Sequence, residues 1–249
     1  MLRQLLAMCC GLAALHAVAA HPHSDDFSGP LRSSVWQIWN SDAPNTMATR
    51  GGWLGLTAGA ADLLFPWDRA GSNPPMLLME LPQRDEAFTI ETHMRVVQSG
   101  GGAWGSLAGL AIFRKDRMAL AVWGVSEVDR VMLWEYDLKT IRPSVWIDIE
   151  APDDASAGVW LQIAKADHEY TFRYRFHGDD EWTERGKWPK GSDYAEHFSS
   201  GDYLVGLIAT GGAREHHAEF DYFDSPELGV LGVDAASKLP LAWAELRAR

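Results

Sequence analysis

Cysteine is almost absent from this chain, which limits how the protein can be stabilised. Its only two cysteines, Cys9 and Cys10, lie within the first twenty residues. If that segment is removed, no thiol remains for a disulfide or for a cysteine-based zinc site. The rest of the 249-residue chain must then depend on its hydrophobic core, and it is long enough to form one.

Long apolar runs and basic residues are also scarce. No segment reaches the ~20 consecutive apolar residues that a membrane-spanning helix needs, so we expect no membrane span. The chain has 22 Lys and Arg against 34 Asp and Glu, a formal net charge of -12. Such a surface repels nucleic-acid phosphates and anionic membranes unless a local basic patch exists, and the sequence shows none, so we expect no nucleic-acid partner. Neutral partners such as polysaccharides remain open.

The first 20 residues have the features of a secretory signal peptide. Arg3 supplies a positive charge, Leu5 to Leu15 is mostly apolar, and small residues allow cleavage after Ala19 or Ala20. This apolar stretch is too short to cross a bilayer. We therefore expect residues 1–20 to be removed and the protein to be secreted or periplasmic.

Short alternating segments separated by turn residues extend from residue 35 to residue 223. In Phe88 to Val96 apolar and polar residues alternate, which is typical of a half-buried strand. In Tyr170 to Phe176 aromatic residues alternate with Thr171, Arg173 and Arg175. Further strand candidates are 53–57, 75–81, 107–113, 117–124, 129–137, 144–150, 158–165, 202–210 and 215–223. Regular strand and turn spacing of this kind predicts an antiparallel, all-β sandwich or barrel.

The domain organisation is predicted to be simple. No linker rich in Pro, Ser or Gly divides the chain, so we expect one domain over residues 21–224. The pattern changes after it, where Pro226 and Pro240 precede a short helix-compatible end. We expect residues 225–249 to form a tail that packs on the outside of the sandwich.

A series of short phrases marks the order of the strands. They are Asp25 to Gly29, Trp36 to Asn40, Gly52 to Leu54, Phe88 to Thr92, Ala108 to Leu110, Trp160 to Ile163, Tyr170 to Tyr174, Val205 to Leu207 and Phe220 to Phe223. In kind and order these phrases resemble the concanavalin A-like domain at the C-terminus of family 43 β-xylosidases. The resemblance spans residues 25–224 and implies a jelly-roll sandwich of two antiparallel sheets, associated with carbohydrate-active enzymes. It implies no active site, because in those β-xylosidases the catalytic carboxylates lie on a separate propeller domain.

Twelve tryptophans are an excess that suits sugar binding, since flat aromatic rings pack against the apolar faces of pyranose rings. Strand alternation indicates which side chains point outward. If Leu120 and Val122 face the core, Trp123 faces outward. The residues predicted in this way to line a ligand-binding groove are Glu91, His93, Arg95, Trp123 and Trp146. The other interpretation is that most of the tryptophans fill the core.

One strand carries candidate catalytic carboxylates. Trp146 to Glu150 resembles the Glu-x-Asp-x-Glu strand of family 16 glucanases, with Trp146 in place of the nucleophile. This leaves Asp148 and Glu150, whose Cα atoms lie ~6.6 Å apart on one face of the strand. Glycoside hydrolysis needs carboxyl groups that flank the scissile bond, and neighbours on one strand flank it poorly. Hydrogen bonds from these acids to sugar hydroxyls are easier to support.

Acidic residues near both ends of the domain suggest a structural calcium ion. If the first and last strands pair, Asp25, Asp26 and Asp221 come together, and carboxylate clusters of this kind bind Ca²⁺. The alternative is that these carboxylates cap turns or are solvated.

Three functions remain open at this stage. The first is a secreted domain that binds plant or cell-wall polysaccharide through a concave face with aromatic platforms. The second is a glycosidase-type hydrolase, with Asp148, Glu150, Glu91 or His93 of the concave sheet in acid or base roles. The third is a structural or interaction domain without a sugar ligand. The sequence does not identify the glycan or the oligomeric state.

Overall fold

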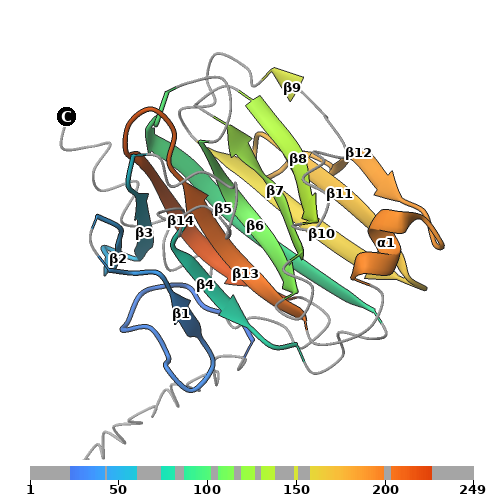
Figure 1. Ribbon diagram of the computed structural model, residues 1–249, viewed down its shortest axis with the longest axis horizontal. Coiled ribbons are helices and arrows are strands. Elements are labelled where there is room, and N and C mark those ends of the chain that lie inside the picture. Colours follow the sequence, from blue (N-terminus) through green and yellow to red (C-terminus); the bar gives the residue numbers. More distant parts are fainter. Residues whose placement is uncertain are drawn as a thin grey trace, which may run out of the picture.

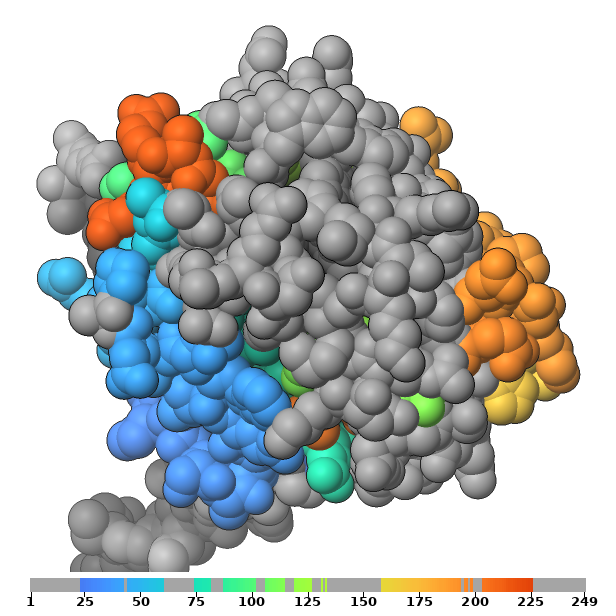
Figure 2. Space-filling model, viewed as in Figure 1, coloured from blue at the N-terminus to red at the C-terminus, as the bar shows by residue number. Residues whose placement is uncertain are grey.

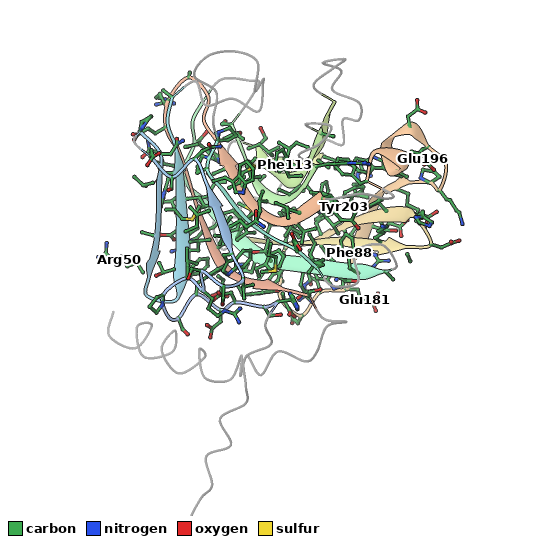
Figure 3. The ribbon with its side chains drawn as sticks, turned by 60° about the horizontal axis from the view of Figure 1, so that its bottom comes forward. Arg50, Phe88, Phe113, Glu181, Glu196 and Tyr203 are labelled. Atoms are coloured by element: carbon green, nitrogen blue, oxygen red, sulfur yellow. The ribbon has the colours of Figure 1, made fainter. Side chains whose placement is uncertain are left out.

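The computed structural model describes residues 23–42, 44–60, 74–81, 87–101, 106–114, 119–126, 130–137, 149–150, 158–198 and 203–225. Within these residues the chain forms two seven-stranded sheets, and every strand pairs with its neighbours in antiparallel fashion. The sheets lie face to face (Figures 1 and 3). The expected all-β sandwich of two antiparallel sheets is confirmed.

Sheet A contains Glu91, His93 and Arg95, three of the five predicted ligand-binding residues. From edge to edge it contains β12 (Thr183–Trp188), β11 (Glu169–Arg175), β10 (Val159–Ala166), β5 (Phe88–Gln98), β14 (His216–Asp224), β3 (Trp53–Ala58) and β2 (Thr46–Arg50). The central strand β5 therefore lies between β10 and β14, the last strand, and the four strands that follow β5 in the chain belong to the other sheet.

Sheet B forms the other layer. From edge to edge it contains β1 (Gln37–Trp39), β4 (Met76–Met79), β13 (Tyr203–Thr210), β6 (Leu107–Arg114), β7 (Ala119–Ser126), β8 (Arg130–Asp137) and β9 (Ile149–Glu150). The chain also forms a five-residue helix, α1 (Asp193–His197), whose N-cap Ser192 accepts a hydrogen bond from the backbone N–H of Ala195. Figure 2 shows residues 23–50, in blue, and β12 with α1, in orange, on opposite sides of the face in view.

The core lies between the sheets and follows from strand alternation. On β5, Phe88, Ile90 and Met94 are buried in it, whereas Arg95 on the other face is exposed. Phe88 meets Tyr203 of β13 across the two sheets, with ring centroids 6.2 Å apart (Figure 3). Each large buried side chain of this kind stabilises the fold by about 1.5–3 kcal/mol relative to an exposed one.

The two ends of the described sandwich meet, as the opening and closing phrases predicted. Asp25 and Phe223 exchange two backbone hydrogen bonds, each of 2.8 Å, in an antiparallel bridge. Trp36, only 3% exposed, packs edge-on against Phe223 with centroids 5.2 Å apart. The first phrase of the sequence is therefore part of the core that closes the sandwich.

Sheet B is apolar on both of its faces, which overturns one prediction. Trp123 is completely buried in the core between the sheets, and its Nε1 donates to the backbone oxygen of Arg173 at 2.7 Å. Leu120 and Val122 belong instead to a second buried cluster on the opposite face of sheet B. All eight residues of β7 are buried, so alternation could not say which face was inner. The outward orientation predicted for Trp123 is wrong.

Some elements were not predicted from the sequence. β1, β2 and β12 lie at sheet edges and have largely exposed or half-exposed side chains, so they show little apolar alternation. The described residues contain no helix long and apolar enough to cross a membrane. Residues 1–20 and 226–249, with the signal-peptide and tail predictions that fall on them, lie outside the described residues.

Candidate functional site

The outer face of sheet A gathers aromatic and charged side chains into one row. We call this row the stripe. Each member contacts the next, in the order Trp182, Arg175, Trp160, His93, Trp53 and Arg95. Three of its members are half-buried tryptophans, from the start of β3, from β10 and from the turn before β12.

The centre of the stripe is the pair Trp160 and His93, which lie opposite each other on neighbouring strands. Their rings are stacked, with centroids 3.9 Å apart and planes inclined by 13°. Trp53 approaches the same imidazole at 5.6 Å with a tilt of 58°. Stacked and tilted aromatic pairs of this kind contribute about 0.5–1.5 kcal/mol each beyond the area they bury.

Guanidinium groups lie over the tryptophans at both ends of the stripe. Arg175 lies 4.5 Å from the ring centroid of Trp182 and 5.7 Å from that of Trp160. Arg95 lies 4.5 Å from the centroid of Trp53, and its Nη2 contacts Glu219 Oε2 at 2.6 Å. Cations within about 6 Å of an aromatic face are attracted to it. The tryptophans are therefore held in place from both ends.

His93 is the most deeply buried member of the stripe and fixes the position of Trp160. It is only 8% exposed, and its Nδ1 lies 3.4 Å from Asp221 Oδ2. Gly158, at φ +104°, leaves the room that the imidazole needs: a Cβ added there would lie 2.6 Å from His93 Nε2. His93 thus positions Trp160 rather than presenting a free ring nitrogen to solvent.

A β-bulge in β14 places two consecutive side chains on this face. The register shifts between Phe220 and Tyr222, so Asp221 is the extra residue of the strand. Asp221 reaches His93, while Tyr222 Oη donates to Glu91 Oε1 at 3.0 Å. Burial, and then the nearby Glu91 carboxylate, raise the pKa of Tyr222 well above its usual value. Tyr222 therefore remains a protonated donor at neutral pH.

A chain of hydrogen-bonded polar side chains lies beside the stripe, across β5, β10 and β11. Gln162 Nε2 donates to Glu91 Oε2 at 3.1 Å, and Arg173 Nη1 donates to Gln162 Oε1 at 2.9 Å. The Glu91 carboxylate therefore accepts hydrogen bonds from Gln162 and Tyr222 and is held in one orientation. Fixed polar groups beside flat aromatic rings are what a sugar-binding face requires.

The structure brings three of the five predicted ligand-binding residues together. Glu91, His93 and Arg95 all lie on the outer face of β5, as alternation predicted. Trp123 lies in the core, and Trp146 lies outside the described residues.

The sequence reasoning missed several members of the stripe as binding residues: Trp53, Trp160, Arg175 and Trp182. For Trp160 the signal was available, because Leu161 and Ile163 are inward residues of the same strand and Trp160 alternates with them.

The predicted catalytic carboxylates are not placed by the described residues. Asp148 lies outside them, and for Glu150 only the backbone is described, in β9, where it pairs with Arg130 of β8. Whether these two acids form a site therefore stays a prediction.

The predicted calcium site is not formed by the described residues, which contain no group of three His, Cys, Asp or Glu side chains placed to hold a metal ion. The Asp25 carboxylate is engaged instead by the Phe27 N–H at 2.9 Å and by Trp36 Nε1 at 2.9 Å. Asp26 accepts from Ser28, and Asp221 contacts His93. The alternative, carboxylates that cap local turns, describes Asp25 and Asp26 correctly.

Comparison with known proteins identifies the class of this sandwich. The family model of the β-xylosidase C-terminal concanavalin A-like domain matches residues 24–225. The fold is thus a concanavalin A-like sandwich, and the chain belongs to that family. No curated protein matches the sequence.

Solved structures agree on the fold. The Bacteroides ovatus xyloglucan PUL protein GH43B is similar with a TM-score of 0.58 and 18% identity, covering 82% of this chain and 39% of its own. The catalytic domain of an endo-1,3-β-glucanase from Thermotoga petrophila RKU-1 is similar with a TM-score of 0.54 and 11% identity, covering 81% and 95%. A functionally unknown protein from Saccharomyces cerevisiae reaches a TM-score of 0.52 and 15% identity, covering 78% and 97%. This chain spans about two fifths of the family 43 protein's length.

Proposed function

We propose that this protein binds carbohydrate through the outer face of sheet A, with the stripe as its platform. The observation that carries the proposal is the row of half-buried tryptophans Trp53, Trp160 and Trp182, each contacted by a guanidinium or imidazole group. Pyranose rings have apolar C–H faces that pack on such rings, and hydroxyl groups that bond to fixed polar neighbours.

Rigidity of the platform supports this function. Binding costs less when the contacting side chains are ordered beforehand, since less rotamer freedom is lost. Trp160 is held by the stacked His93 ring, and Glu91 is held by Tyr222 and Gln162. The face therefore offers an apolar surface and an oriented hydrogen-bond acceptor that are both present before ligand arrives.

The location and ligand of the protein form part of the proposal. The features of residues 1–20 support export, after which the domain would meet plant or cell-wall polysaccharides. The names of similar structures refer to xyloglucan, to xylan β-1,4-xylosidase and to endo-1,3-β-glucanase. These names suggest which polymers to test first, namely xylan, xyloglucan and β-1,3-glucan.

Native affinity electrophoresis through gels cast with each polymer tests the proposal. We expect selective retardation in at least one gel, and we expect Trp160→Ala or Trp182→Ala to weaken binding about tenfold or more, as truncation of a central aromatic does. Trp39→Ala is the matched control, because Trp39 is a half-buried tryptophan of sheet B that packs on Phe113. Thermal melts of each variant show whether it is folded.

Three results would change the account. Absence of retardation in every gel would favour a structural domain without a sugar ligand. Retardation that survives in both stripe variants would place binding elsewhere on the molecule. Cleared zones in a stained gel would show hydrolysis, and Glu150→Gln would then test the carboxylates of the 146–150 strand.

A further inference from the structure

Two arginines on the outer face of β11 have no carboxylate partner among the described residues. Arg173 and Arg175 are two residues apart on this strand, so both point outward. Arg173 donates to the side-chain amide of Gln162, and Arg175 Nη1 donates to the backbone oxygen of Asp180 at 3.4 Å. Neither contact neutralises the guanidinium charge.

This arrangement is unusual for the surface on which it occurs. The chain has 34 acidic residues against 22 basic ones, so partners of opposite charge are abundant. Other described cations use them: Arg95 pairs with Glu219, and Lys190 pairs with Asp167 at 2.7 Å. Among the described residues, the two arginines of β11 have no such partner.

Three acids on or beside these strands make their printed contacts with other groups than the two guanidiniums. Glu184 lies opposite Arg173 in the strand register, but its carboxylate contacts Lys187 at 3.6 Å. Asp180 Oδ2 accepts the backbone N–H of His177 at 3.1 Å. Glu91 accepts from Tyr222 and Gln162. None of these three carboxylates contacts the guanidinium of Arg173 or Arg175 directly, and Glu91 reaches Arg173 only through Gln162.

Arg175 is moreover fixed in place. Its guanidinium lies between the rings of Trp182 and Trp160, at 4.5 and 5.7 Å. Its Nε is enclosed and has no hydrogen-bond partner among the residues that the structure describes. A buried charged donor without an acceptor lowers the stability of the fold. Proteins retain unfavourable groups of this kind mainly at functional sites.

We infer that Arg173 and Arg175 bind the carboxylates of uronic-acid units in an acidic polysaccharide laid along the stripe. This inference rests on the proposed function and specifies its ligand class. A guanidinium presents donors in a planar fork that matches the two oxygens of a carboxylate. The tryptophans on either side of Arg175 would pack on the sugar rings that carry the carboxylates. A simple inorganic anion has no such ring and would gain nothing from these tryptophans.

Pairs of polymers that differ only in their carboxyl groups test the inference. We would measure the dissociation constants of the full chain for glucuronoxylan and polygalacturonate, and for the same polymers after carboxyl reduction to neutral sugars. We expect at least one acidic polymer to bind about tenfold or more tightly than its reduced form, with the difference falling at high salt. Arg175→Gln should remove most of that difference.

Lys190→Gln is the matched control, because it removes one positive charge from an exposed side chain outside the stripe. It should preserve the preference for the acidic polymer. If Arg175→Gln does not fold, Arg173→Gln provides the same comparison. Equal binding of acidic and reduced polymers would overturn the inference and leave the proposed function intact. If none of the four polymers binds, the inference is wrong. If the protein is also not retarded in any gel cast with xylan, xyloglucan or β-1,3-glucan, the proposed function is wrong as well.

Discussion

His93 of β5 and Trp160 of β10 are stacked face to face on the outer surface of sheet A, 3.9 Å apart. They are direct partners in the strand register, so the sheet itself sets their spacing. Asp221 contacts the imidazole at Nδ1, and Gly158 leaves the space that its other nitrogen occupies. The proposed binding platform thus depends on a residue that is itself almost entirely buried.

Removal of the imidazole should loosen Trp160 and weaken carbohydrate binding. His93→Ala deletes a ring that stacks on one tryptophan and contacts another, so we expect about 2 kcal/mol lower stability and weaker binding. His93→Phe keeps an aromatic ring and should retain most of the binding. Urea unfolding and affinity electrophoresis measure the two effects. Equal loss of binding in both variants would mean that an imidazole nitrogen, rather than the stacked ring, matters.

Gly158 should tolerate no side chain. In Gly158→Ala the new Cβ would lie 2.6 Å from both His93 Nε2 and the backbone oxygen of Met94, at a φ of +104° that side chains disfavour. We expect a loss of more than about 1 kcal/mol of stability together with weaker binding. Gly29→Ala is the control, since a Cβ there meets no atom within 4 Å. An unfolding midpoint of Gly158→Ala equal to that of Gly29→Ala would contradict this geometry.

Acid should destabilise the protein through His216. This residue is buried, and burial lowers its pKa to about 4 from the ordinary 6.5. The unfolded chain therefore binds a proton that the folded chain does not bind as the pH falls from 6.5 towards 4. The stability that this contributes is complete above pH 6.5 and is lost across that window, about 3 kcal/mol in all.

His216→Asn isolates this effect, because the amide can accept the Gly100 N–H that His216 Nδ1 accepts at 3.1 Å, but it does not titrate. Unfolding free energies of both proteins at pH 4 to 7.5 give the comparison. The stability of the wild type should fall more steeply than that of the variant below pH 6.5. Parallel curves would show that His216 titrates normally in the folded state.

Trp123 should matter for stability and not for ligand contact. It is completely buried, and its Nε1 donates to the backbone of β11 across the core. Trp123→Ala should cost about 3–5 kcal/mol of unfolding free energy. Trp123→Phe should cost less and, once folded, should bind polysaccharide as the wild type does. If the Trp123→Phe variant folds but no longer binds polysaccharide, Trp123 takes part in ligand binding after all.

Much of sheet A could be predicted because its strands have one polar face. β5 and β11 alternate apolar and polar residues, and that pattern gave both the strands and the outward positions of Glu91, Arg95, Arg173 and Arg175. The meeting of the two ends also followed from the opening and closing phrases.

Sheet B could not be predicted at the same level. Its central strands are apolar on both faces, so the pattern reveals a strand but not which side is inner, and Trp123 was placed outward for that reason. The calcium prediction shows a different limit. Proximity of Asp25 to the last strand was correct, but the sequence could not reveal that Trp36 and Phe27 donate to its carboxylate.

Hydroxyl-radical footprinting with mass spectrometry would show which sheet the polysaccharide covers. Oxidation of individual tryptophans would be measured with and without the polysaccharide that retards the protein in the affinity gels. If the stripe is the binding site, the polysaccharide should protect its tryptophans Trp53, Trp160 and Trp182, while oxidation of Trp39 on sheet B is unchanged. Protection of Trp39 with no protection of Trp160 would contradict this prediction and place the ligand on the opposite sheet.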